Sequence, residues 1–72
     1  MSPTAPAVSR AAEALKRSVH PALRQLRVEE TEAAIVITGR VSSYYLKQLA
    51  QETIMPLRDG RDLHNRVTVV RS

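Results

Sequence analysis

The sequence contains no cysteine, phenylalanine or tryptophan among its 72 residues. Without cysteine, neither a disulfide framework nor a thiolate metal site can brace so short a chain. Tyr44 and Tyr45 are its two aromatic residues of the Phe, Trp and Tyr type, whereas proteins that bind single-stranded nucleic acid usually offer several stacking rings. Nucleic acid is therefore not an expected partner.

Long apolar runs are also missing. No stretch approaches the roughly 18 apolar residues of a transmembrane helix, and the start, MSPTAPAVSR, lacks the apolar segment of a signal peptide. We therefore expect a cytoplasmic protein from the sequence as written. If the chain is an excised part of a longer exported protein, a periplasmic or envelope-associated location is expected instead.

Combinations of residues that carry catalysis are not apparent either. His20 and His64 are the two histidines, and neither has an acidic or histidine partner at the spacing of metal ligands. Ser42 and Ser43 lack the surrounding sequence of a nucleophile elbow. We predict a protein that is not an enzyme, with no catalytic residues, no cofactor and no metal site.

Positive charge is in modest excess. Eleven Lys and Arg residues against seven Asp and Glu residues give a net charge of +4. This charge suits anionic partners such as lipid head groups. It also suits a small domain that simply needs to remain soluble, so both interpretations stay open.

The first helix is predicted after a short tail. Two prolines among small residues predict a disordered tail over residues 1–8, and one domain is expected over residues 9–71. Ser9 is a suitable N-cap, and an apolar stripe with helical spacing predicts a helix over residues 10–19. The stripe consists of Val8, Ala12, Leu15 and Val19. Pro21 would close this helix, with a further short turn over residues 22–25.

A β-hairpin is predicted next. Residues 26–31 alternate in polarity, a turn falls near residues 32–33, and the β-branched run at residues 35–38 begins a second strand. Period-2 alternation places four residues of that strand on one covered face: Ile35, Ile37, Gly39 and Val41. Gly39 marks a close backbone approach, which we expect a helix to make.

The pattern then changes to helical periodicity. Six residues form one apolar stripe: Leu46, Leu49, Ala50, Thr53, Ile54 and Leu57. Ser42 or Ser43 supplies the N-cap, and Pro56 predicts that the regular helix ends by about residue 55. A loop over residues 58–62 contains Gly60, and alternation predicts a last strand over residues 63–70.

The predicted order is α-β-β-α-β, an α+β fold in one domain. Each helix has one apolar stripe and each strand one mostly apolar face, so we expect a two-layer sandwich. Two helices would cover one face of a three-stranded mixed sheet. The other face would be open to water and carries mostly polar residues: Arg27, Glu29, Thr38, Arg40, Arg66 and Thr68.

This succession resembles the BON domain, the bacterial osmotic-shock and nodulation module. The resemblance rests on the leading amphipathic helix, the hairpin, ITGRVSS at residues 37–43, the helix that carries Ala50, and L-x-N-x-V-x-V at residues 63–69. It covers most of residues 9–70. The resemblance implies a binding module with a role in envelope maintenance and proposed binding to phospholipid surfaces.

The start of the second helix is the candidate contact site for an anion or lipid. A helix N-terminus favours negative charge, and basic groups and amphipathic rings are expected nearby. The candidate residues are Arg40, Ser43, Tyr44, Tyr45 and Lys47. The leading hypothesis is a non-catalytic BON-like module that engages anionic phospholipid or an envelope or protein partner. The alternative is a structural accessory domain that mediates self-association or protein contact, and the oligomeric state is left open.

Overall fold

The structure confirms the predicted α+β class. The computed structural model describes residues 9–70, so the tail predicted over residues 1–8 lies outside the described residues. The elements in chain order are α1 (Arg10–Lys16), α2 (Pro21–Arg24), β1 (Arg27–Glu30), β2 (Ala34–Val41), α3 (Tyr44–Ile54), the 3-10 helix η1 (Met55–Leu57) and β3 (Asp62–Val69).

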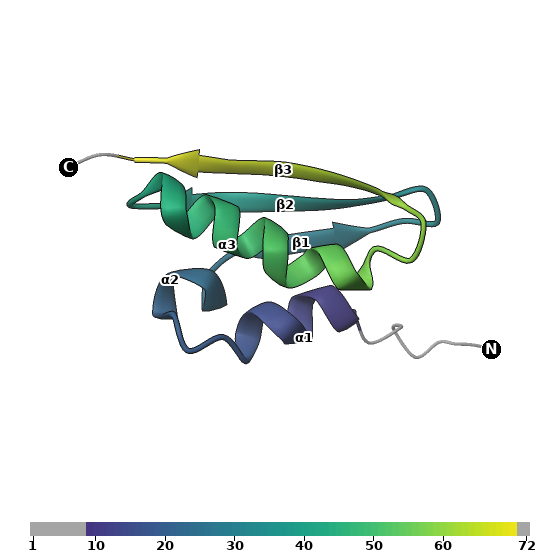
Figure 1. Ribbon diagram of the computed structural model, residues 1–72, viewed down its shortest axis with the longest axis horizontal. Coiled ribbons are helices and arrows are strands. Elements are labelled where there is room, and N and C mark those ends of the chain that lie inside the picture. The colour runs from purple at the N-terminus through teal and green to yellow at the C-terminus, as the bar shows by residue number, and fades with distance from the viewer. Residues whose placement is uncertain (1–8, 71–72) are drawn as a thin grey trace.

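The three strands form one mixed sheet in the order β1-β2-β3. β1 is antiparallel to β2, with Val28 opposite Ile37, and β3 is parallel to β2, with Asn65 opposite Ile37. The parallel pair requires a crossover, which α3 provides (Figure 1). β2 is thus the central strand, and β1 and β3 are the edges.

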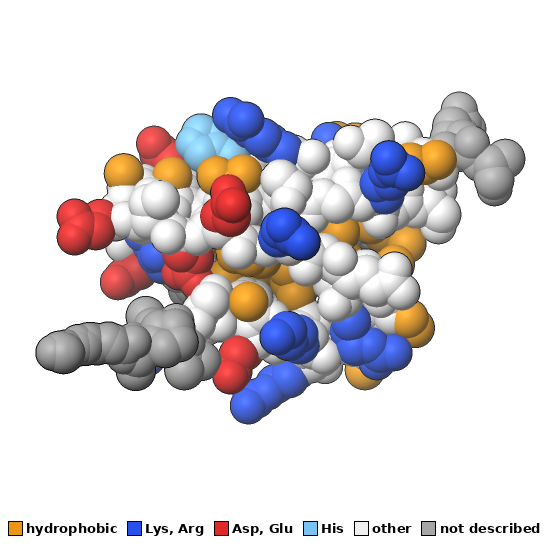
Figure 2. Space-filling model, turned by 180° about the vertical axis from the view of Figure 1, so that it is seen from behind, with side chains coloured by type: hydrophobic (Ala, Val, Ile, Leu, Met, Phe, Trp, Pro, Cys, Tyr) orange, Lys and Arg blue, Asp and Glu red, His pale blue; other side chains and the backbone are white. Residues whose placement is uncertain are grey.

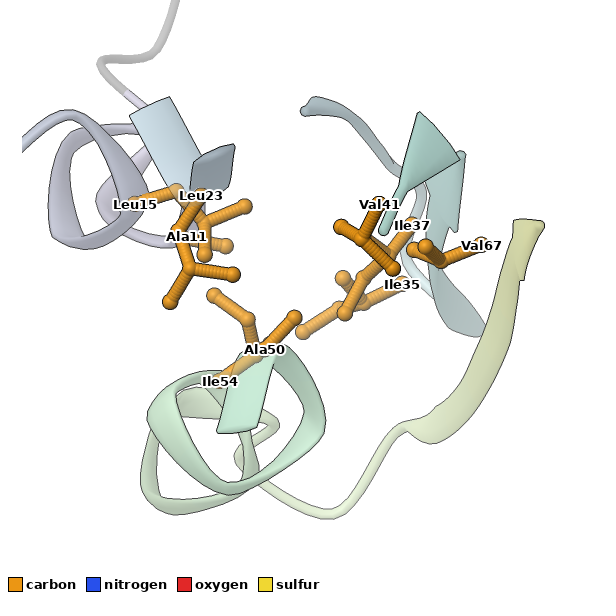
Figure 3. Packing of buried hydrophobic residues seen from close by; sticks show 9 residues of the cluster. All are labelled: Ala11, Leu15, Leu23, Ile35, Ile37, Val41, Ala50, Ile54 and Val67. Carbon is orange, nitrogen blue, oxygen red and sulfur yellow. The ribbon is translucent and has the colours of Figure 1, made fainter. Parts of the chain in front are cut away.

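All helices lie on the same side of the sheet, and the core fills the space between the two layers (Figures 1 and 3). The buried residues are Ala11, Leu15, Leu23, Ile35, Ile37, Val41, Ala50, Ile54 and Val67. On the opposite face of the sheet Arg27, Arg40 and Arg66 are exposed. The predicted two-layer packing with one open sheet face is confirmed.

α1 is shorter than the sequence predicts. Ser9 caps it as expected by accepting a hydrogen bond from the Ala12 N–H at 3.0 Å, but the helix ends at Lys16. The Ser18 N–H donates to the Leu15 carbonyl at 3.1 Å, which tightens the last turn and redirects the chain. Val19 therefore leaves the helical stripe, and its predicted place in the core is wrong.

The hairpin turn uses a threonine in place of a glycine. The Thr31 hydroxyl accepts hydrogen bonds from the Ala33 N–H at 3.2 Å and the Ala34 N–H at 3.0 Å. The Thr31 N–H donates to the Ala34 carbonyl at 2.8 Å. A side-chain oxygen that satisfies backbone donors in this way stabilises a tight turn without a positive φ.

Gly39 is a position of close approach on β2, as predicted, but its neighbour is not a helix. Its φ is +134°, and a Cβ added there would lie 2.7 Å from Cδ2 of Leu26. Leu26 immediately precedes β1 and packs against the core. The glycine thus makes room for the side chain that leads into the neighbouring strand.

α3 begins and ends where the sequence predicts. Ser43 is the N-cap and accepts from the Leu46 N–H at 3.2 Å, and regular helix ends at Ile54, before Pro56. Ala50 and Ile54 are buried, whereas Leu46 and Leu49 pack at the margin of the core. Within residues 9–70, no helix has the length and hydropathy needed to cross a bilayer.

Candidate functional site

Exposed apolar side chains gather at one end of the molecule. Five large hydrophobic residues are exposed within residues 9–70: Val19 (84%), Tyr44 (68%), Tyr45 (65%), Val70 (45%) and Met55 (39%). The tyrosines open α3, Val70 follows β3 and Val19 lies between α1 and α2. These segments lie toward the left end of the molecule in Figure 1, whereas Met55 follows the opposite end of α3. We call Val19, Tyr44, Tyr45 and Val70 the apolar end.

Side-chain contacts join the separate segments of the apolar end. The rings of His20 and Tyr45 meet edge-to-face, with centroids 6.4 Å apart and planes at 77°. This contact joins the connection between α1 and α2, which contains Val19, to the first turn of α3. The end of β3 lies beside them, because Val69 lines a groove together with Ser43 and Tyr44.

Two open grooves run through the same region. One is lined by Ala22, Gln25, Arg40, Val41, Ser42 and Val70, and the other by Ser42, Ser43, Tyr44 and Val69. Ser42 lines both, so the grooves adjoin. The surface therefore combines apolar walls with hydroxyl groups and one guanidinium.

The N-terminus of α3 adds partial positive charge to this end. Its first N–H groups have no acceptor within the helix, and Ser43 satisfies that of Leu46. Those of Tyr44 and Tyr45 have no such intrahelical acceptor and lie at the positive end of the helix dipole. The serine cap thus uses one donor of the first turn and leaves the dipole in place.

The five candidate residues are only partly brought together. Ser43 and Tyr44 line one groove and Arg40 lines the adjoining one. Lys47 is half-buried, and its carbonyl accepts a hydrogen bond from Asn65 Nδ2 at 2.8 Å, so its position on α3 is turned toward β3. Tyr45 and Lys47 line neither groove.

Acidic side chains are concentrated toward one end of the molecule, whereas Lys and Arg side chains lie over both halves of Figure 2. All seven acidic residues of the sequence fall within the described range. Glu29, Glu30 and Glu32 belong to the hairpin, and Asp59 and Asp62 belong to the loop and strand start beside it, because Ala34 pairs with Asp62. In Figure 2, seen from behind, acidic side chains lie over one half and none appears over the half that contains the apolar end. The apolar end is consequently free of negative side chains on that face.

A structural ion pair holds the acidic end together. Arg61 donates to Glu30 Oε1 at 2.8 Å, and the Ser9 hydroxyl donates to the other carboxylate oxygen. The hydrogen bond from Ser9 first, and then the bond and charge of Arg61, lower the pKa of Glu30 below its ordinary value of 4.5, against the opposing effect of burial. These contacts join the start of α1, β1 and the loop before β3.

Sequence reasoning missed two members of the apolar end, Val19 and Val70. Helical spacing predicts Val19 in the apolar stripe, although Ser18 before it and Pro21 after it are residues that favour a helix boundary. Val70 follows the alternation of β3 on the side away from the core, where it is 45% exposed. An apolar residue on a polar face was the available signal for an exposed contact.

The described residues contain no cluster of three or more His, Asp or Glu side chains arranged to hold a metal ion. Comparison of the chain with protein-family models, with curated proteins and with solved structures finds no match. The resemblance to the BON domain therefore stays a prediction.

Proposed function

We propose that this chain is a non-catalytic, BON-like binding module whose apolar end engages anionic phospholipid surfaces. The observation that carries the proposal is the grouping of Val19, Tyr44, Tyr45 and Val70 at the end of the molecule away from the acidic hairpin. Four exposed apolar side chains at one end of a small domain favour an apolar or interfacial partner.

The chemistry of the apolar end suits a membrane interface. Tyrosine has an apolar ring and a polar hydroxyl, and such rings are enriched at the level of lipid head groups. The aliphatic side chains of Val19 and Val70 can enter the acyl boundary beside them. Phosphate groups would then meet Arg40 and the positive end of the α3 dipole.

The position of the acidic side chains would orient the module. The acidic hairpin end would be repelled by an anionic surface while the other end is attracted. Each basic residue near such a surface contributes about 1 kcal/mol, so binding should weaken as salt screens the charges.

Vesicle sedimentation tests the proposal. We expect the chain to sediment with vesicles of phosphatidylcholine mixed with phosphatidylglycerol, less so at high salt, and not with phosphatidylcholine alone. The double variant Tyr44→Ser/Tyr45→Ser and the variant Arg40→Ala should each reduce binding.

Matched controls come from the other end of the chain. Met55→Ser removes an exposed apolar side chain and Arg58→Ala an exposed arginine, both remote from the apolar end, so binding should be retained. Equal sedimentation with both vesicle types, or equal loss in the control variants, would refute the proposal.

A further inference from the structure

β3 is an edge strand of eight residues. Its end contacts show which of its backbone groups face β2: the Asp62 N–H donates to the Ala33 carbonyl at 3.1 Å, and the Val70 N–H donates to the Val41 carbonyl at 2.8 Å. Alternate residues of a parallel strand bond to the same neighbour. Even-numbered residues of β3 therefore bond to β2, and odd-numbered residues direct their N–H and C=O groups outward.

Two outward donors near this edge are already used. The Val67 N–H donates to the side-chain oxygen of Asn65 at 3.2 Å, and the Arg61 N–H donates to the Arg58 carbonyl at 2.9 Å. Between them, Leu63 and Asn65 present N–H groups toward the open edge. The strand contains no proline or lysine, which are common protections of such edges.

The exposed side chains of β3 carry opposite charges at a spacing of four residues. Asp62, His64 and Arg66 lie on the open face of the sheet and are exposed. In the described part of the chain neither Asp62 nor Arg66 has a salt-bridge partner. An antiparallel copy of the same strand, centred on His64, would place each Asp62 opposite an Arg66.

We propose that two copies of this chain pair through β3, antiparallel and with the two-fold axis at His64, to form a six-stranded sheet. Leu63 of one copy faces Asn65 of the other, and each pair exchanges two backbone hydrogen bonds. Pairing ends where the Val67 and Arg61 donors are already occupied. Two symmetric ion pairs between Asp62 and Arg66 flank the axis.

Other symmetric registers fit less well. An axis at Asn65 pairs Leu63 with Val67 and needs the occupied Val67 donor, while placing His64 opposite Arg66. An axis at Arg66 brings the two arginines together. An axis at Leu63 needs the N–H of Arg61, which is occupied. The backbone donors and the charges thus select the same register.

Charge-reversal variants test this dimer by sedimentation equilibrium between about 10 µM and about 1 mM. The wild-type chain should show a reversible, concentration-dependent dimer. Asp62→Arg and Arg66→Asp should each raise the dimer Kd at least about tenfold, because each reversal converts two attractive cross-strand pairs into repulsive ones. An equimolar mixture of the two variants should associate as tightly as the wild type.

A matched pair on the opposite edge provides the control. Glu29→Arg and Arg27→Asp make the same charge changes on β1, where both residues are exposed, and mixing them should give no gain. In the wild type, amide exchange of Leu63 and Asn65 should slow as concentration rises, whereas that of Val67 should not change. A monomer throughout the range, no gain on mixing the β3 variants, or an equal gain with the β1 variants would overturn the proposal.

Discussion

Among single residues, Gly39 of β2 is the one that makes room for Leu26, the residue that precedes β1. Its φ of +134° is a conformation that residues with a Cβ rarely adopt, and the space for a Cβ is filled by Leu26. Substitution therefore meets both backbone strain and a side-chain clash.

We predict that Gly39→Ala lowers the free energy of unfolding by roughly 1–3 kcal/mol. Gly60→Ala is the matched control, because Gly60 also has a positive φ, +82°, but no atom within 4 Å of an added Cβ. Urea unfolding of both variants measures the difference. An equal loss in the two would mean that contact with Leu26 contributes nothing.

Glu30 should make stability depend on pH. Its pKa is lowered by the Ser9 hydroxyl and by Arg61, so the folded state favours the charged carboxylate. The resulting stability is fully present above the ordinary pKa of 4.5 and is lost as pH falls through the lowered value in the folded protein.

Glu30→Gln should therefore lower stability at neutral pH by roughly 1–3 kcal/mol and flatten its dependence on pH in the acid range. Glu32→Gln, an exposed neighbour in the same hairpin, serves as the control. The free energy of unfolding of both variants is measured across this pH range. The same loss and the same pH dependence in the two would contradict this role of Glu30.

At the scale of elements, α3 depends on its contact with the sheet. Ile54 is fully buried, whereas Leu49 packs at the margin of the core. We predict that Ile54→Ala costs roughly 2–5 kcal/mol, the range for deleting buried methyl groups, and that Leu49→Ala costs less. Urea unfolding followed by circular dichroism checks the order, and a larger loss for Leu49→Ala would contradict the packing described.

The elements that could be predicted are those whose apolar period continues without interruption. β2 alternates and α3 repeats at helical spacing, and α3 has clear ends at Ser43 and Pro56. α1 could not be bounded, because Val19 continues the stripe numerically although the chain has already turned at Ser18. The contact between Gly39 and Leu26 could not be predicted either. A glycine in a strand indicates a close approach, but not which segment makes it.

Asn65 shows how one polar side chain can join elements that the sequence separates. Its amide donates to the Lys47 carbonyl at 2.8 Å, and its oxygen accepts from the Val67 N–H at 3.2 Å. The first bond attaches α3 to β3 and the second satisfies an outward donor of the edge strand. Its inward position follows from alternation along the strand, but its partner on α3 does not.

For the whole molecule, the sequence gives a net charge of +4. It does not predict that the acidic side chains lie toward one end. That arrangement depends on the parallel pairing of β2 and β3, which brings the acidic hairpin and the loop before β3 together. Of the candidate site, Ser43, Tyr44 and Tyr45 could be located from the start of the helix. Val19 and Val70 join them only through the fold.

The most direct test of lipid binding by the apolar end is a map of backbone amide shifts on titration with anionic bicelles. We predict that the largest shifts fall on residues 19–20, 40–45 and 69–70, with little change in the hairpin or at Met55. Tyr44→Ser/Tyr45→Ser should reduce all of them together. Shifts concentrated on the middle of the open sheet face or on α1, or no shifts anywhere, would contradict the account.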